Sequence, residues 1–141
     1  YGYWQADDLT LGQQLGLYPD AAVLAGLYAD REHAKQRMLD SLHSLHSLPD
    51  EYGRQAHGMV MNPILNRGIH YHVAMTNSAL LGLQPEDWLN MQAPVNVPGT
   101  THEIYPNWRR KLSCSLHAMF HNPEVTSLLT EIDRRRRQLS Y

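Results

Sequence analysis

A polar turn near residue 96 carries the side chains best suited to bind a ligand. Residues 96–111 read NVPGTTHEIYPNWRRK. The amide of Asn96 can donate and accept hydrogen bonds at once, which suits pairs of hydroxyl groups such as those on a sugar. Gly99 permits a left-handed backbone or a close approach to a ligand. The alternative interpretation is an ordinary surface loop held in place by a packed Trp108 ring.

Nine histidines raise the question of a metal site. His117 and His121 are four residues apart, a spacing that puts two ligands on one face of a helix. No Glu lies between them, and Cys114 is the single cysteine of the chain. The other histidine pairs fall on different predicted elements. We therefore assign no metal ligand and no cofactor, and we interpret the histidines as solvated or hydrogen-bonded.

Charged residues offer two further candidates for chemistry. Glu86 and Asp87 are adjacent, but the paired carboxylates of a glycosidase flank a sugar ring at ~5 to 9.5 Å. Adjacent side chains on a helix point about 100° apart, so we place both acids in the first turn of a short helix.

The four arginines at 134–137 could contact nucleic-acid phosphates. No aromatic residues are interleaved with them, and cations also stabilise a helix C-terminus, so we expect no nucleic-acid partner.

Two blocks of the sequence resemble the bacterial 4-α-glucanotransferases, also called amylomaltases or disproportionating enzymes, of glycoside hydrolase family 77. The family shows an N-x-P-G-T turn followed by P-N-W-R-R, which residues 96–100 and 106–110 match at this spacing. The second block is Gly2-Tyr3-Trp4-Gln5 near the N-terminus. The resemblance spans nearly the whole chain. It implies a mostly α fragment of an α/β protein, the C-terminal part of a (β/α)8 TIM barrel with its surrounding helices.

The resemblance also implies an activity. The family transfers segments of α-1,4-glucan to an acceptor glucan or glucose by a retaining mechanism that needs a nucleophilic Asp, an acid–base Glu and a third Asp. In the family the third acid lies in a Thr-His-Asp motif just before the Gly-aromatic-Trp block. All three acids are therefore expected upstream of Tyr1, no catalytic residue is assigned here, and the fragment alone is expected to be inactive.

The roles of individual residues follow from the same matching. Asn96 corresponds to an asparagine in the family's substrate cleft, and Trp4 corresponds to the aromatic residue after the third acid, so the resemblance implies substrate binding at both. The rest of the signature is implied to be scaffold, and it comprises Pro98, Gly99, Asn107, Trp108 and Arg109. We expect the Trp108 ring to be packed. A self-standing helical protein-interaction module is the alternative function.

The length, net charge and cysteine content of the chain limit the classes of protein to which it can belong. A chain of 141 residues forms one domain over residues 1–141, but it is too short for a complete barrel of the usual size. The net charge of −2 gives no general attraction to nucleic acid or membrane lipid. One cysteine suits a reducing cytoplasm, and no apolar run approaches the ~20 residues that span a bilayer. A partial barrel would leave strand edges and an apolar face uncovered, so we expect self-association.

Apolar spacing predicts the elements that hold these residues. A short helix is expected over 9–17, and two consecutive helices over 20–48, with Asp30 as the cap of the second. Residues 69–75 read as helix, and the small apolar run 78–83 reads as a buried parallel strand.

The last part of the chain is helical in the same interpretation. Pro85 begins a short helix over 86–90. Asn122 caps a C-terminal helix whose first residue is Pro123. The pairs Glu131 with Arg135 and Asp133 with Arg137 stabilise that helix at i,i+4 spacing.

Overall fold

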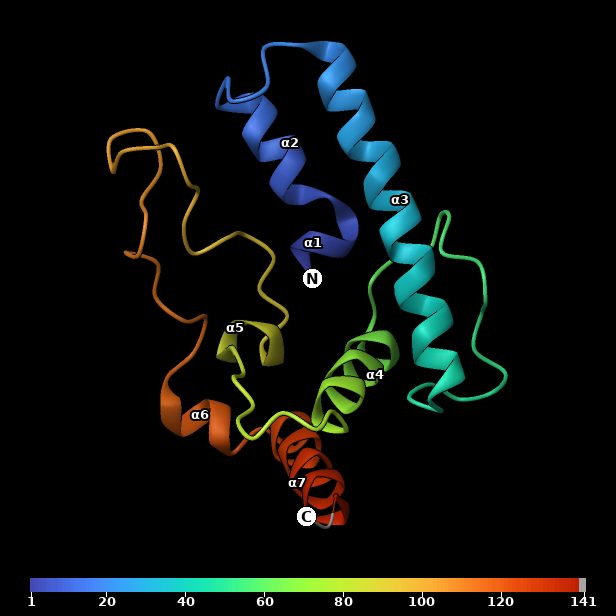
Figure 1. The fold of residues 1–141 in the computed structure, drawn as a ribbon. Coiled ribbons are helices and arrows are strands. Elements are labelled where there is room, and N and C mark those ends of the chain that lie inside the picture. The colour runs from blue at the N-terminus through green and yellow to red at the C-terminus, as the bar shows by residue number, and fades with distance from the viewer. Residues whose placement is uncertain (140–141) are drawn as a thin grey trace.

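The structure, a computed structural model, describes residues 1–139 as a chain of helices joined by long loops (Figure 1). No strand occurs between residues 1 and 139. The mostly α character of the chain is therefore confirmed, whereas the barrel to which it would belong stays a prediction. The helices are α1 (Gly2–Gln5), α2 (Asp7–Gln14), α3 (Ala21–Ser44), α4 (Pro63–Ala74), α5 (Pro85–Trp88), α6 (Leu116–Phe120) and α7 (Pro123–Gln138).

The longest helix, α3, corrects one prediction. We predicted two helices with Asp30 as a cap, but the helix is continuous and Asp30 lies exposed in its interior. Asp20 is the cap instead, because its side chain accepts hydrogen bonds from the backbone N–H groups of Ala22 and Val23 at 2.7 and 3.3 Å. No proline interrupts α3. Its buried side chains keep helical spacing throughout: Leu24, Lys35, Leu39, Leu42 and His43.

The shorter predicted helices occur with shifted ends. The first is α2, which ends two residues before Gly16, the predicted end. The helix predicted over 69–75 begins earlier, because Asn62 caps α4 by accepting a hydrogen bond from the backbone N–H of Leu65 at 3.0 Å. Pro85 is the first residue of α5, and Glu86 and Asp87 lie in its first turn, as predicted.

The main core joins α1, α3 and α4. Its centre is Trp4, whose side chain is 2% exposed and whose indole N–H donates to the carbonyl oxygen of Met59 at 2.8 Å. Gly68 lets α4 approach the loop after α3, because a Cβ there would lie 2.5 Å from Leu48 Cδ2. Around Trp4 the cluster contains Leu39, Leu42, Leu48, Ala56, Met61 and Leu65. The core thus ties the N-terminal helix to the middle of the chain.

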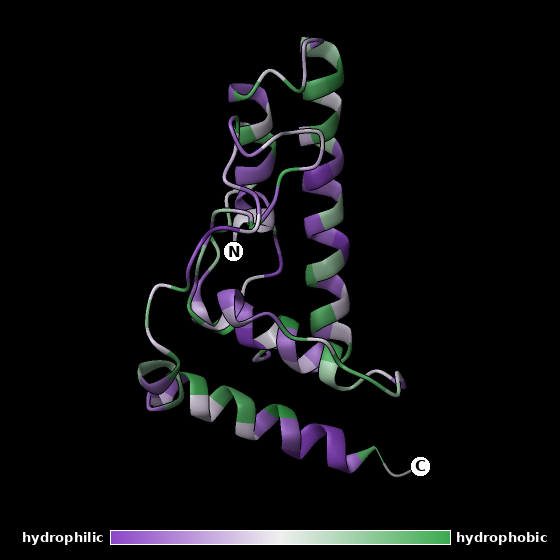
Figure 2. Cartoon of the chain, turned by 90° about the vertical axis from the view of Figure 1, so that its left-hand side faces the viewer, coloured by the Kyte–Doolittle hydropathy of each residue, from purple (hydrophilic) through white to green (hydrophobic). Residues whose placement is uncertain are grey.

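The C-terminal helix forms a separate layer against α4 (Figures 1 and 2). Asn122 accepts a hydrogen bond from the backbone N–H of Glu124 at 2.9 Å, and Pro123 follows as the first helical residue, which confirms the predicted start. The two predicted i,i+4 ion pairs are also present, from Arg135 to Glu131 at 2.6 Å and from Arg137 to Asp133 at 2.8 Å. The buried side chains between the two helices are Ala74, Leu128 and Ile132.

The predicted strand over 78–83 is wrong. The segment is a loop, and Leu80 is 88% exposed. A strand needs a neighbouring strand to bond its backbone, and between residues 1 and 139 none exists. Arg136 takes part of that role, because its guanidinium donates to the carbonyl oxygens of Thr76 at 2.9 Å, Ser78 at 2.7 Å and Ala79 at 3.3 Å.

Replacing Arg136 by Met should remove these bonds while keeping most of the apolar stem. We expect the free energy of unfolding to fall by about 1.5 kcal/mol, because bonds from a charged donor contribute more than neutral ones. Urea denaturation followed by circular dichroism measures the change. Arg137→Met is the matched control: it loses only an exposed pair with Asp133 and should cost about 0.3 kcal/mol. Equal losses in the two variants would contradict the structural role of Arg136.

Candidate functional site

The turn that carries Asn96 is held by the side chain of a second asparagine. Asn107 Oδ1 accepts the backbone N–H of Val97 at 2.7 Å, and its Nδ2 donates to Thr100 at 3.2 Å (O) and 2.9 Å (Oγ1). The backbone N–H of Trp108 donates to the carbonyl oxygen of Val95 at 2.9 Å. Asn107 therefore bridges the two arms of the loop, which is the scaffold role implied by the family signature.

Gly99 has the left-handed backbone that the sequence analysis considered. Its φ is 82°, a conformation that residues with a Cβ rarely adopt. Next to it, Thr100 closes the turn, because its hydroxyl donates to the carbonyl oxygen of Val97 at 2.7 Å. The proline–glycine–threonine part of the signature is thus explained by local backbone geometry.

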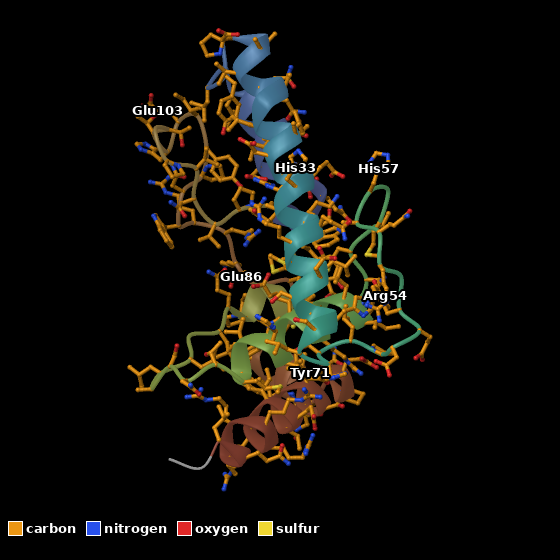
Figure 3. All side chains as sticks on the ribbon, turned by 45° about the vertical axis from the view of Figure 1, so that its right-hand side comes forward. His33, Arg54, His57, Tyr71, Glu86 and Glu103 are labelled. Atoms are coloured by element: carbon orange, nitrogen blue, oxygen red, sulfur yellow. The ribbon has the colours of Figure 1, made fainter. Side chains whose placement is uncertain are left out.

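The base of the loop lies beside the N-terminal helices (Figure 1). Tyr105 donates its hydroxyl hydrogen to the carbonyl oxygen of Pro94 at 2.6 Å, and Arg110 donates to that of Ala93. Gly2 permits the close approach of this segment, because a Cβ at Gly2 would lie 2.3 Å from the carbonyl oxygen of Gln92. Figure 3 shows Glu103 in the outer part of the loop, away from Glu86 of α5.

Asn96 itself is half-buried and makes no side-chain hydrogen bond within residues 1–139. Its amide keeps two donor hydrogens and an acceptor oxygen for another molecule. The neighbouring backbone is fixed by the bonds of Asn107, so that the amide sits on an ordered turn. This arrangement suits a binding residue, and the contact with substrate remains a prediction.

Trp108 does not pack as we predicted. Its side chain is 74% exposed, and its φ is 59°, in the left-handed region. The backbone bond to Val95, rather than the indole ring, closes the loop. The ring therefore stands in solvent in the same loop as Asn96. Aromatic surfaces combine an apolar face with a polar edge, so Trp108 is a candidate contact that the sequence analysis treated only as scaffold.

Trp4 lies in the core, and its indole N–H is already bonded to Met59. Its ring, although 2% exposed, lines a cavity together with Tyr1 and Tyr3. The prediction that Trp4 contacts substrate is therefore limited to contact through the ring.

A second cavity, of about 330 Å³, lies between α1, α5 and the segment after α5. It is lined by three carboxylates, those of Asp8, Glu86 and Asp87, and by Arg110. Asp8 receives both terminal nitrogens of Arg31 at 2.8 Å each, and this hydrogen bonding lowers the pKa of the carboxyl below its usual range. Asp8 is thus held ionised in an ion pair, which does not suit a proton donor.

The histidines do not assemble a metal site among residues 1–139, where no group of three or more His, Cys, Asp or Glu side chains converges. The rings of His117 and His121 stack with their centroids 4.0 Å apart. His121 Nδ1 also lies 2.7 Å from the carbonyl oxygen of His117. Both side chains are exposed.

Within the described part of the chain, no helix has the length and apolar character needed to cross a membrane. The arginine run at the end of α7 bonds to Glu131, to Asp133 and to backbone carbonyl groups of the loop after α4. These bonds give the run a structural explanation.

These features describe a helical segment that presents an ordered asparagine-bearing turn. The chain matches the family model of the 4-alpha-glucanotransferases, glycoside hydrolase family 77, over residues 2–117. It is also 39% identical over 134 residues to a 4-alpha-glucanotransferase of Haemophilus influenzae strain Rd, a match that covers 95% of this chain and 19% of that protein. The chain belongs to the 4-alpha-glucanotransferase family. It spans about a fifth of the length of the curated relative that it matches.

Proposed function

We propose that this chain is the C-terminal portion of a 4-α-glucanotransferase that moves segments of α-1,4-glucan to an acceptor glucan or glucose. The observation that carries the proposal is the 39% identity over 95% of the chain to a protein of that name. A maltodextrin substrate follows from the same relationship. We propose no metal and no organic cofactor. A cytoplasmic location is part of the proposal, because a single cysteine suits a reducing compartment.

In the proposed mechanism the chemistry is done by carboxylates outside this segment. A nucleophilic Asp attacks the anomeric carbon of the donor, the glycosidic C–O bond breaks, and a Glu gives its proton to the departing 4-oxygen. The same Glu then removes a proton from the 4-hydroxyl of the acceptor, which displaces the enzyme carboxylate and forms the new glycosidic bond. The segment described here would supply the barrel's surrounding helices and part of its substrate rim.

Since the catalytic carboxylates lie outside this segment in the proposed mechanism, we assign substrate binding to the turn at Asn96. Its free amide can bond neighbouring sugar hydroxyls, and the exposed ring of Trp108 lies in the same loop. Asn107 would act on the substrate only indirectly, by fixing the turn.

The function is tested with the full-length protein that contains this segment. Incubated with maltotriose, it should produce both glucose and longer maltodextrins, which thin-layer chromatography resolves. The 141-residue chain alone should produce neither, because it lacks a nucleophile and an acid. A full-length protein that leaves maltotriose unchanged would contradict the transferase proposal and favour the alternative, a helical interaction module.

We also propose that the isolated chain self-associates. Apolar side chains that lie exposed in this structure include Val60, Leu80 and Phe120, and exposed apolar surface promotes association. Light scattering of the 141-residue chain should therefore give a mass above that of a monomer. A monodisperse monomer at high concentration would contradict this part of the proposal.

A further inference from the structure

Three aromatic side chains border a cavity that is separate from the turn at Asn96. The cavity has a volume of about 320 Å³ and lies between α1, α3, α4 and residues 82–87. Tyr1, Tyr3 and Trp4 line it from the N-terminal side. Small-molecule sites in proteins begin at about this size, and they combine apolar walls with a few polar groups.

Two polar side chains of the cavity come from α4, and their hydrogen-bonding atoms are only partly used by the protein. Asn66 and His70 are 8% and 6% exposed. Asn66 Nδ2 donates to the carbonyl oxygen of Asp87 at 3.0 Å, and His70 Nδ1 lies 2.9 Å from the carbonyl oxygen of Asn66. The other polar atoms of these side chains, Asn66 Oδ1 and His70 Nε2, have no hydrogen-bond partner among residues 1–139. Both atoms remain accessible to solvent, and because both residues line the cavity, a ligand there can bond them.

The charge of the lining selects a neutral ligand. Asp87 contributes a carboxylate, and among the described residues no Lys or Arg side chain lines the cavity. Gln84 adds an amide that makes no hydrogen bond of its own within residues 1–139. The N-terminal ammonium group of Tyr1 lies 3.7 Å from Asp87 Oδ1 and pairs with that carboxylate, so among the described residues the lining offers no unpaired cation to a phosphate or carboxylate ligand. It offers hydrogen-bond partners of both kinds to hydroxyl groups.

A pyranose ring fits a cavity that has aromatic side chains on one side and hydrogen-bonding groups on the other. It presents a face of C–H groups, which packs on aromatic rings, and an edge of hydroxyls, which needs donors and acceptors. We propose that the cavity binds one glucosyl unit of an α-1,4-glucan, as a subsite additional to the turn at Asn96. The choice of an α-glucan among neutral sugars rests on the proposed function, whereas the choice of a neutral, ring-shaped ligand rests on the cavity.

Two glycines allow a matched test. Gly82 lines the cavity, its φ lies outside the left-handed region, and a Cβ there meets no atom within 4 Å. Gly82→Leu should therefore fold and place apolar atoms where the ligand would sit. Gly26 on α3 has the same open space and is not among the residues that line the cavity. Gly26→Leu is the control for the substitution itself.

The experiment is a titration of the 141-residue chain with maltotriose, followed by two-dimensional ¹H–¹⁵N NMR. We expect saturable shifts at the Trp4 indole N–H and the Asn66 side-chain amide, with a dissociation constant on the order of millimolar. Gly82→Leu should weaken binding at these resonances by about tenfold or more, and Gly26→Leu should leave it unchanged. Cellotriose, which is β-linked, should bind more weakly than maltotriose.

Three results would overturn the inference. They are the absence of saturable shifts at Trp4 and Asn66, unchanged binding in Gly82→Leu, and equal binding of cellotriose. Shifts confined to the turn at Asn96 would remove the cavity subsite and leave the proposed function standing. The proposed function is judged separately, by transfer from maltotriose in the full-length protein.

Discussion

Trp4→Ala should lower the free energy of unfolding by about 4 kcal/mol, the largest effect that we expect from a single substitution in this chain. Truncation of a buried Trp usually costs ~3 to 5 kcal/mol, because the apolar transfer energy is lost and a cavity remains. The Trp4 side chain is 2% exposed at the centre of the main core. Its loss also leaves the carbonyl oxygen of Met59 without the indole donor.

Trp108→Ala is the matched control for that prediction. The same substitution at a ring that is 74% exposed should change the free energy of unfolding by about 0.5 kcal/mol or less. Urea denaturation monitored by far-ultraviolet circular dichroism compares the two variants with the wild-type chain. Losses of similar size would show that the Trp108 ring packs, as the sequence first suggested, and would contradict the arrangement described here.

Asn96→Ala should lower the transfer efficiency of the full-length protein by about ten- to thirtyfold at limiting maltotriose. The substitution removes one or two hydrogen bonds to sugar hydroxyls, each on the order of 1 kcal/mol. Folding should be unaffected, because the Asn96 amide makes no bond within residues 1–139 that the alanine would lose. Initial rates of glucose release at maltotriose concentrations below KM give the ratio.

The control for this prediction is Asn77→Ala, which removes an exposed amide in the loop after α4. It should leave transfer kinetics unchanged. If Asn96→Ala also retains the wild-type kcat/KM, the turn is scaffold only, and the assignment of substrate binding to Asn96 is lost. A lowered melting temperature in Asn96→Ala would instead point to a structural role.

Local signals predicted some helix ends correctly. The start of α7 is encoded by neighbouring residues, an asparagine whose side chain accepts a backbone N–H and a proline that is favoured in the first turn. The continuity of α3 was not predicted, because Asp30 has the composition of a cap, and only its surroundings show that it lies on the exposed face of an unbroken helix. Local propensity cannot distinguish these two roles.

Features that depend on distant partners were missed. The apolar run at 78–83 has strand composition, but the backbone carbonyls of Ser78 and Ala79 accept hydrogen bonds from Arg136, more than fifty residues away. The position of Trp108 depends on a backbone bond across the loop, which periodicity does not reveal.

For the candidate site, the sequence indicated the left-handed Gly99 next to Asn96, because a turn is local. The binding role of Asn96 stays a prediction. It did not identify the cavity, whose walls come from α1, α3, α4 and residues 82–87. The one signal available was the four-residue spacing of Asn66 and His70, which puts them on the same face of α4. That spacing alone does not separate a binding face from a packed one.

The hydrogen bonds from Arg136 to residues 76–79 bear on where this chain could be shortened without loss of its fold. The family match ends at residue 117, before α7 begins. Yet α7 covers Ala74 at the end of α4, and its Arg136 bonds the loop that leads to the cavity lining. A truncation after residue 117 would therefore expose the end of α4 and release that loop. α7 is therefore part of what holds this fold together, although it lies outside the residues that match the family model.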